Sequence, residues 1–533
     1  MREKLRSWVN SLAPRLKEAD ELPLTLASLV AGAVSLLLVW GFTYPPFIDA
    51  ANVAYSGEVM HDLWRGGAVY GKWYAFRSGA MSHMAFYWLY HALRAIFAPV
   101  VCVKLLATVG VLGLPLAMRG LLRAMNRTLW LSVPAFALAF NTNLNMGYLP
   151  FVIGVPLIPV SLMLIEQNAN QPRAWRCVAL ATVLIGSLWV HFFLTAILLP
   201  LATLWSLLCL RGRSRRWFVA LITIALTVAA SVVFLRSSIP AWQRVFQWIP
   251  YSERWDQLDR DVLQWTTDGL PALSFPLLLL AFVASLVLTH RTPTSDHGLR
   301  AARGALGAAL LFGAYLLGPN YISWPEPAWG FGTRIGIAFA LCLLLVPTTS
   351  ATGWGRVVQV SPWLAFTAFH LASLLGPFRA YAAVLEPLAV LHEGLPPHAT
   401  ILPLYDSEWL KDPARYSFGG FTGFVFKHAG KWLAVETDGY QPWSFCDAGY
   451  HPIECVARLP APSQATLSLG SSESLNHYDY LLLRQSAATP WGGLSKNSWS
   501  LLRKSGEWSL WRNISGTQPS VNGPPGQPSP TSP

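Results

Sequence analysis

Acidic residues and a histidine gather in the segment PPFIDAANVAYSGEVMHDLWRGG, which follows the first long apolar run of the chain. Asp49 stands near its start, and Glu58, His61 and Asp62 follow on what we expect to be a helix. Glu58 and Asp62 are four residues apart, so both carboxylates would lie on one helix face beside His61. A partly desolvated carboxylate can act as a general base or coordinate a divalent ion. The alternative is a solvated helix face capped by Asp49.

Further polar residues near the predicted ends of apolar runs could contact a substrate. Arg334, in WGFGTRIGIAF, could hold a lipid phosphate with its forked donors, or could be an interfacial anchor that snorkels. His191 could carry protons, or its ring could be satisfied by backbone carbonyls. The asparagines of the turn NTNLNMG, Asn145 among them, could bind a ligand or simply close the turn. The candidate substrate-binding residues are therefore His61, Asn145, His191 and Arg334.

The segment 236–270 alternates tryptophans with charged residues, which predicts an amphipathic helix that covers a site or anchors the bundle. The sequence contains no phosphate-binding glycine loop, dinucleotide fingerprint, zinc-ligand spacing or nucleophile elbow. Soluble nucleotide-binding enzymes are thus poor candidates. We expect no cofactor and no resident metal site, although a divalent cation is compatible with carboxylate chemistry.

The composition requires that most of the chain avoids water. Hydrophobic residues make up 53% of the 533 residues and charged residues only 12%. No ordinary soluble domain of this length has such a surface, so the chain must face lipid or the interior of a helix bundle. The formal charge of +12 lies in short clusters between apolar runs, which indicates topology and lipid headgroups rather than nucleic acid.

Eleven apolar runs predict about eleven transmembrane helices. The first, residues 22–42, is too long for a removed signal peptide and is expected to be retained. The others lie at residues 99–118, 129–141, 147–165, 177–190, 193–210, 217–235, 271–289, 304–318, 334–348 and 360–376. We therefore expect an all-α membrane bundle over residues 22–376.

Basic residues set the expected orientation, because they concentrate in short cytoplasmic loops. With a cytoplasmic N-terminus at residues 1–21, every basic connector falls on the same, cytoplasmic side. This orientation then leaves the large first loop 43–98, the loops 236–270 and 319–333, and everything after about residue 377 on the extracytoplasmic side.

The C-terminal part is expected to form a small extracytoplasmic α/β domain over residues 377–514. A helical stretch at 381–392 precedes strand-like runs at 399–405, 431–436 and 478–484. Cys446 and Cys455 stand close together there, and a disulfide between them would suit an oxidising compartment; the alternative is two free buried thiols. Residues 515–533 are rich in Pro, Gly and Ser and are expected to be disordered.

This arrangement resembles the GT-C class of polytopic membrane glycosyltransferases. The resemblance covers most of the chain and is carried by its order of elements and by three passages: PPFIDAANVAYSGEV, NTNLNMGYLPFVIGVPL, and LPPHATILPLY with the later HYDYLLLR. These passages are similar to those of bacterial GT-C-like proteins. The resemblance implies that Asp49 is the catalytic base, for which Asp62 could substitute, and that Arg334 contacts a lipid phosphate.

By that resemblance, the protein would transfer a sugar from a polyprenyl-phosphate donor to a glycan, lipid or protein acceptor. It would do so on the extracytoplasmic side of a bacterial inner membrane. Two alternatives stay open: a transporter or flippase, since many spans and few intramembrane polar groups suit that role also, and a non-catalytic envelope protein.

Overall fold

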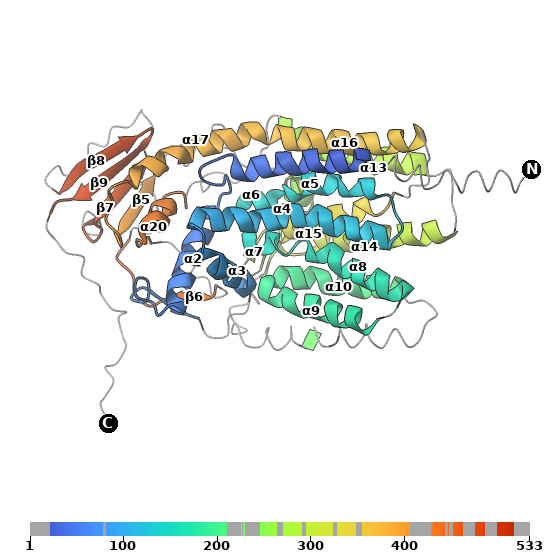
Figure 1. Cartoon of the computed structure of the whole chain (residues 1–533), viewed down its shortest axis with the longest axis horizontal. Helices are drawn as coiled ribbons and strands as arrows, with labels where there is room; N and C mark the ends of the chain where they lie inside the picture. Colours follow the sequence, from blue (N-terminus) through green and yellow to red (C-terminus); the bar gives the residue numbers. More distant parts are fainter. Residues whose placement is uncertain are drawn as a thin grey trace, which may run out of the picture.

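The computed structural model describes residues 22–77, 82–171, 173–209, 225, 228–229, 246–263, 270–289, 295–322, 328–347, 354–405, 428–442, 446, 451–461, 475–484 and 498–515. These residues are mostly helical. The long helices run side by side, and a small sheet region lies beyond one end of them (Figure 1). We call that end of the helices the sheet end of the bundle.

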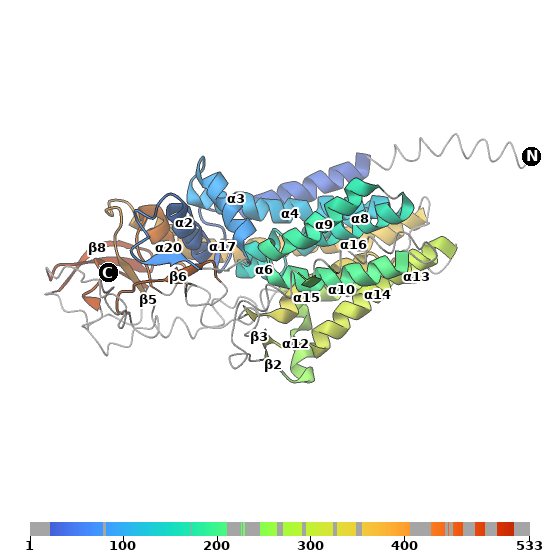
Figure 2. The ribbon, with the colours of Figure 1, turned by 90° about the horizontal axis from the view of Figure 1, so that it is seen from below.

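Five helices of the described residues are long and apolar enough to cross a membrane. They are Leu22–Trp40, α4 (Pro99–Ala124), Leu149–Asn170, α10 (Phe192–Cys209) and Val358–Leu391. The third contains α7 (Leu149–Val152) and α8 (Leu157–Asn170), and the fifth joins α16 (Trp354–Ser373) to α17 (Leu375–Leu391). They lie roughly parallel to one another in two views (Figures 1 and 2).

The expected count of about eleven spans exceeds these five. Four further apolar helices are shorter than the roughly 20 residues that a span needs: α9 (Ala174–Val190), α13 (Ser274–Thr289), the apolar part of α14 (Ser295–Leu317) and α15 (Phe331–Leu344). The expected run at 129–141 divides at Pro134 into η1 (Leu129–Ser132) and α5 (Pro134–Ala139), since proline cannot continue a helix ladder. The run at 217–235 lies almost wholly outside the described residues.

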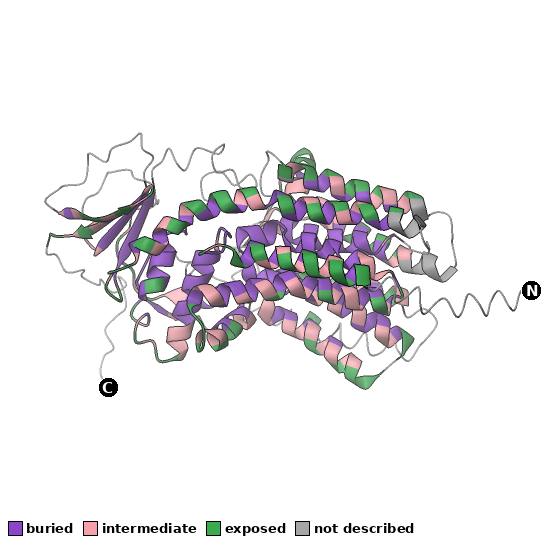
Figure 3. Cartoon of the chain, turned by 45° about the horizontal axis from the view of Figure 1, so that its top comes forward, coloured by how far each residue is buried: buried purple, intermediate pink, exposed green. Residues whose placement is uncertain are grey.

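Large apolar side chains are exposed along the outward faces of the bundle (Figure 3). Leu29 is 63% exposed, Leu116 66% and Val178 65%. A water-soluble protein rarely leaves such extensive apolar surface uncovered, whereas a lipid-facing surface has this character. The helices and this surface together suggest a membrane protein.

The sheet region at the C-terminal end has one four-stranded sheet. Its strands are β5 (Ile401–Tyr405), β7 (Tyr480–Arg484), β9 (Trp508–Asn513) and β8 (Trp499–Ser505), in that spatial order. The first pair is parallel and the others are antiparallel. The strands expected at 399–405 and 478–484 are thereby confirmed, and the helix expected at 381–392 is the end of α17.

The strand expected at 431–436 is wrong, because these residues form the helix α20 (Lys431–Thr437). Leucine, alanine, lysine and glutamate all favour helix in this segment, KWLAVET. A short apolar run does not by itself separate a strand from a buried helix. This correction matters because α20 packs against α2 (Ala50–Trp64), the helix that follows Asp49.

Segments that we expected on one side of the membrane do contact one another. Strand β1 (Tyr74–Phe76), from the first loop, pairs with β6 (Ile453–Cys455). Strand β2 (Phe246–Gln247) pairs with β3 (Tyr321–Ile322), which pairs with β4 (Ala328–Trp329). The expected amphipathic helix in loop 236–270 is present as α12 (Tyr251–Val262). Which side of a membrane these segments face stays a prediction.

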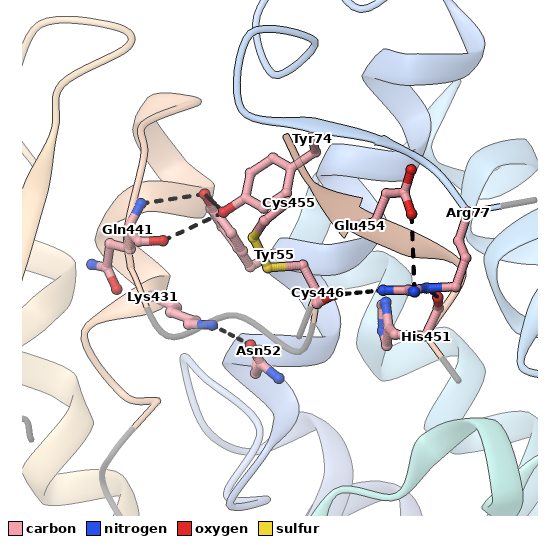
Figure 4. The surroundings of a disulfide bond; sticks show 10 residues. All are labelled: Asn52, Tyr55, Tyr74, Arg77, Lys431, Gln441, Cys446, His451, Glu454 and Cys455. Atoms are coloured by element: carbon pink, nitrogen blue, oxygen red, sulfur yellow. Dashed lines mark hydrogen bonds and ion pairs between the residues drawn. A yellow bond between two sulfur atoms is a disulfide. The ribbon is translucent and has the colours of Figure 1, made fainter. Parts of the chain in front are cut away.

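A disulfide joins Cys446 to Cys455, as expected (Figure 4). Arg77, which follows β1, donates hydrogen bonds from Nη2 to the Cys446 carbonyl at 2.8 Å and from Nε to the His451 carbonyl at 3.1 Å. The first loop therefore binds the disulfide-closed segment through strand pairing and through the hydrogen bonds of the Arg77 guanidinium.

Candidate active site at the sheet end of the bundle

Asp49 lies at the N-terminus of α2. The backbone of the turn NTNLNMG (residues 141–147), which we call the asparagine turn, supports it. The N–H groups of Ile48 and Asp49 donate to the carbonyls of Asn145 and Met146, each at 3.0 Å. Gly147 has φ +80°, and a Cβ there would come within 2.7 Å of the Asp49 nitrogen. Asp49 occupies the N-cap position of α2, but its side chain makes no capping hydrogen bond.

A histidine from the C-terminal region faces Asp49. The Nε2 atom of His428 is 3.8 Å from the Asp49 Oδ1 atom, and the two side chains are 8% and 13% exposed. A histidine at this distance can hold a carboxylate in place and stabilise its charge when protonated. Because His428 is 379 residues from Asp49, no local sequence pattern could have indicated it.

A second polar pair lies one helical turn farther along α2. Lys431, which is only 2% exposed, donates from Nζ to the Oδ1 atom of Asn52, and its ammonium lies 5.2 Å from the centre of the Tyr55 ring (Figure 4). Asp49 and Asn52 are three residues apart on one face of α2. Their partners are also three residues apart: His428 lies in the turn before α20, and Lys431 is the first residue of α20.

Arg334 lies in the first turn of α15 and is 5% exposed. Its guanidinium is 4.5 Å from the centre of the Tyr148 ring and 4.8 Å from that of Phe193, and Nη1 donates to the Gly330 carbonyl at 3.0 Å. The adjacent Thr333 carbonyl accepts a 2.8 Å hydrogen bond from Asn143 of the asparagine turn. The asparagine turn therefore supports both Asp49 and the start of α15.

Tyr148 connects Arg334 with Asp49 electrostatically. Burial raises the pKa of the Tyr148 hydroxyl to about 12, the positive charge of Arg334 opposes that rise, and the negative charge of Asp49 adds to it. Both charges thus act on the same side chain. The expected base and the expected phosphate contact are brought to one neighbourhood by segments almost 300 residues apart.

His191 also belongs to this neighbourhood. Its ring lies 4.6 Å from that of His83, which is 6.4 Å from His451. The Nε2 atom of His451 is 2.9 Å from the Tyr87 hydroxyl. Burial and the positive charge of Arg334 lower the pKa of His83 to about 3, so this imidazole is neutral at neutral pH. No group of three or more metal-ligating side chains occurs in the described part of the chain.

Glu58 and His61 lie farther along α2, with partners of their own. Nine and twelve residues of helix separate them from Asp49, or about 14 and 18 Å. Both Glu58 oxygens accept from Arg94 Nε at 2.8 and 3.0 Å, and Oε1 also accepts from the Tyr90 hydroxyl at 2.7 Å. The ring of His61 packs 4.7 Å from that of His91 on α3 (Met84–Arg94).

Asp62 closes the loop that follows α2. Its Oδ2 atom accepts from the backbone N–H groups of Val69 at 3.1 Å and Tyr70 at 2.7 Å. Glu58, His61 and Asp62 are thus engaged in holding α2 to its neighbours, and the structure does not bring them together with Asp49.

The three asparagines of the turn differ in their hydrogen bonding. Asn141 Oδ1 accepts from the backbone N–H of Asn143, and Asn143 binds Thr333 as described. Both amide atoms of Asn145, which is 4% exposed, lack a hydrogen-bond partner among the described residues. The same holds for Asn52 Nδ2 and Ser56 Oγ, whose side chains are fully buried. Leaving such an atom unpaired costs about 1–3 kcal/mol, so we expect a water molecule or a ligand to pair with it.

The arrangement offers a carboxylate beside a histidine, two buried cations, and uncharged polar groups with unused hydrogen-bonding capacity. It suits deprotonation of a hydroxyl and stabilisation of a negative leaving group. A scan against models of protein families finds no match for this chain, and a search of curated proteins finds no significant relative.

Proposed function

We propose that this protein is a GT-C-like membrane glycosyltransferase that moves a sugar from a polyprenyl-phosphate donor to an acceptor hydroxyl. The observation that carries the proposal is that one short segment contacts both residues: the Met146 carbonyl accepts from the Asp49 N–H at 3.0 Å, and the Tyr148 ring lies 4.5 Å from the Arg334 guanidinium. A general base and a phosphate-binding cation at the end of apolar helices are what such a reaction needs.

In the proposed reaction the acceptor oxygen attacks the anomeric carbon while Asp49 takes the hydroxyl proton. The bond between that carbon and the phosphate oxygen breaks, and the bonding electrons leave with the polyprenyl phosphate. Arg334 stabilises the charge that develops on this leaving group. One base suffices for such an inverting transfer, which forms no covalent intermediate with the enzyme.

The neighbours of these two residues have supporting roles in the proposal. His428, whose Nε2 atom is 3.8 Å from the Asp49 Oδ1 atom, would position the Asp49 carboxylate. His191 packs against Phe151 and Phe193, the rings that also contact Arg334, and the neutral imidazole of its neighbour His83 adds no competing charge. Glu58, His61 and Asp62 are left out of the proposed chemistry, because their contacts fix α2 in place.

The proposal includes a location. The sheet end of the bundle would face the extracytoplasmic side of a bacterial inner membrane, where polyprenyl-phosphate sugars reach the site from the outer leaflet. The disulfide supports this, since the bond between Cys446 and Cys455 requires an oxidising compartment. Exposed apolar side chains around the bundle would contact the lipid.

The test is transfer of labelled sugar from a panel of polyprenyl-phosphate donors by the purified protein in nanodiscs. Asp49→Asn should lower the transfer rate at least a hundredfold, because the base is lost. Arg334→Lys keeps the charge but removes the forked donor geometry, and it should weaken transfer less than Arg334→Ala. Polyprenyl phosphate release, measured by mass spectrometry, reports the reaction whatever the acceptor is.

Matched control variants are available among exposed residues. Asp256 on α12 and Arg512 on β9 are exposed, so Asp256→Asn and Arg512→Ala should transfer sugar like the wild type. If the wild type transfers no sugar from any donor, or if Asp49→Asn remains fully active, the proposal fails. Uptake or flipping of a lipid-linked substrate would then be the activity to measure.

A further inference from the structure

Three uncharged polar side chains, two within about 10 Å of Asp49 along α2 and one on the asparagine turn, have unused hydrogen-bonding capacity. The unsatisfied atoms, judged among the described residues, are Asn52 Nδ2, Ser56 Oγ and both amide atoms of Asn145. All three side chains are more than nine-tenths buried. Asn52 and Ser56 lie one and two helical turns beyond Asp49 on the same face of α2, while the Asn145 carbonyl binds the N–H just before Asp49.

The hydrogen-bonding character of these atoms identifies what they could bind. Lys431 can only donate, so the amide oxygen of Asn52 must face Lys431, and the Asn52 Nδ2 donor points elsewhere (Figure 4). Ser56 both donates and accepts, and Asn145 offers two donor hydrogens and an acceptor oxygen. The set is therefore uncharged and mixed in donors and acceptors.

A phosphate or carboxylate does not match this set. Ionised oxygens only accept, so an anion would leave Asn145 Oδ1 unsatisfied in the interior. Hydroxyl groups donate and accept at once, and a sugar presents several of them at fixed spacing. Water has the same capacity as a hydroxyl, and the experiment below separates water from sugar.

We infer that Asn52, Ser56 and Asn145 bind the hydroxyl groups of an uncharged saccharide beside Asp49. The assignment of that saccharide as the acceptor rests on the proposed function, whereas the binding site does not. Under the proposed function, the acceptor is a glycan rather than a lipid or a protein. In this proposal Arg334 binds the phosphate of the charged donor, and the face of α2 beyond Asp49 binds the hydroxyl groups of the neutral acceptor.

The experiment measures binding of methyl glycosides of glucose, mannose, galactose and arabinose to the full chain in nanodiscs, by saturation-transfer NMR and titration. The wild type should bind at least one of them. Ser56→Ala and Asn52→Leu should each weaken that binding about tenfold, the effect of one lost hydrogen bond. The exposed residues Ser252 and Asn170 provide the controls Ser252→Ala and Asn170→Leu, which should bind like the wild type.

Thermal unfolding without sugar separates a binding role from a structural one. Ser56→Ala removes an unsatisfied hydroxyl, so its Tm should equal or exceed that of the wild type. A clear fall in Tm for Ser56→Ala would mean that ordered water satisfies Ser56 in a structural role, and would overturn the inference. Failure of every methyl glycoside to bind, or equal binding by wild type and both variants, would overturn it also.

Transfer assays distinguish this inference from the proposed function. Sugar binding that depends on Ser56 and Asn52, without any transfer, would support the saccharide site and contradict the proposed glycosyltransferase activity. If the protein transfers sugar and its KM for a glycan acceptor is unchanged in Ser56→Ala and Asn52→Leu, the glycosyltransferase proposal is supported and the saccharide site is contradicted.

Discussion

Along helix α2, the carboxylates toward the far, C-terminal end are paired within the protein, whereas uncharged polar groups nearer to Asp49 are not. At the far end, Glu58 and Asp62 each accept two or more hydrogen bonds from neighbouring groups. At the near end, Asn52 and Ser56 have buried polar atoms with no partner among the described residues, next to Asp49. The Nδ1 atom of His61, toward the far end, also lacks a hydrogen-bond partner among the described residues. The contrast therefore lies between the paired carboxylates, which have the character of structure, and the unpaired amide and hydroxyl groups, which have that of a binding site.

Among the variants that test this comparison, Glu58→Gln is expected to lower the stability of the protein most. Breaking a buried ion pair costs several kcal/mol, and the effect is reduced here because the Arg94 side chain is 29% exposed. We expect a loss of about 2 kcal/mol in the free energy of unfolding, measured as a lower Tm, with transfer per folded molecule unchanged. The exposed Glu253 on α12 provides the control Glu253→Gln, which should leave Tm unaltered.

Glu58→Gln can also break the comparison. A loss of transfer at an unchanged Tm would place Glu58 in the chemistry and would make the far end of α2 part of the active site.

A smaller effect is expected from Asp62→Ala. This change leaves the backbone N–H groups of Val69 and Tyr70 without their acceptor, for a loss of about 1 kcal/mol in unfolding free energy. Asp62→Asn keeps one acceptor oxygen and should recover most of the stability. If Asp62→Asn instead abolished transfer while Tm stayed high, the negative charge of Asp62 would have a catalytic use.

The smallest effect concerns pH. Burial, together with the positive charges of His91, Arg94 and Arg65, lowers the pKa of His61 to about 4, whereas an unfolded chain has a histidine pKa of about 6.5. Between these values the unfolded state binds more protons, so stability is full above pH 6.5 and falls as the pH drops toward 4. Thermal unfolding across this range should show a shallower fall in His61→Gln than in the wild type. Identical pH curves would contradict the assigned environment of His61.

Sequence patterns predicted those features that depend on neighbours along the chain. The apolar runs correspond to helices wherever the structure describes them, and the nine-residue spacing of Cys446 and Cys455 predicted their disulfide. Asp49 and Arg334 were chosen as candidates from their position at the ends of apolar runs. The geometry that joins them through Tyr148 is a property of the packed helices.

Features that depend on distant segments could not be predicted in this way. His428 and Lys431 meet Asp49 and Asn52 only because α20 packs on α2, and α20 itself was mistaken for a strand. The pairing of β1 with β6 has no local signature either, since each strand has only three residues. Local periodicity indicates which face of an element is buried, but not which distant element covers it.

The pairing of β1 with β6 sets the earliest time at which the first loop can complete its folding. Tyr74 pairs with Cys455, so the first loop emerges from the ribosome long before its partner strand exists. At synthesis rates of about 5–20 residues per second, that interval is on the order of tens of seconds. Throughout this time Asp49 lacks His428, and Arg77 lacks the disulfide-closed segment. Assembly of the site is therefore a late event of biosynthesis, and a chain truncated before His428 would keep its apolar helices while lacking the histidine and the lysine that face α2.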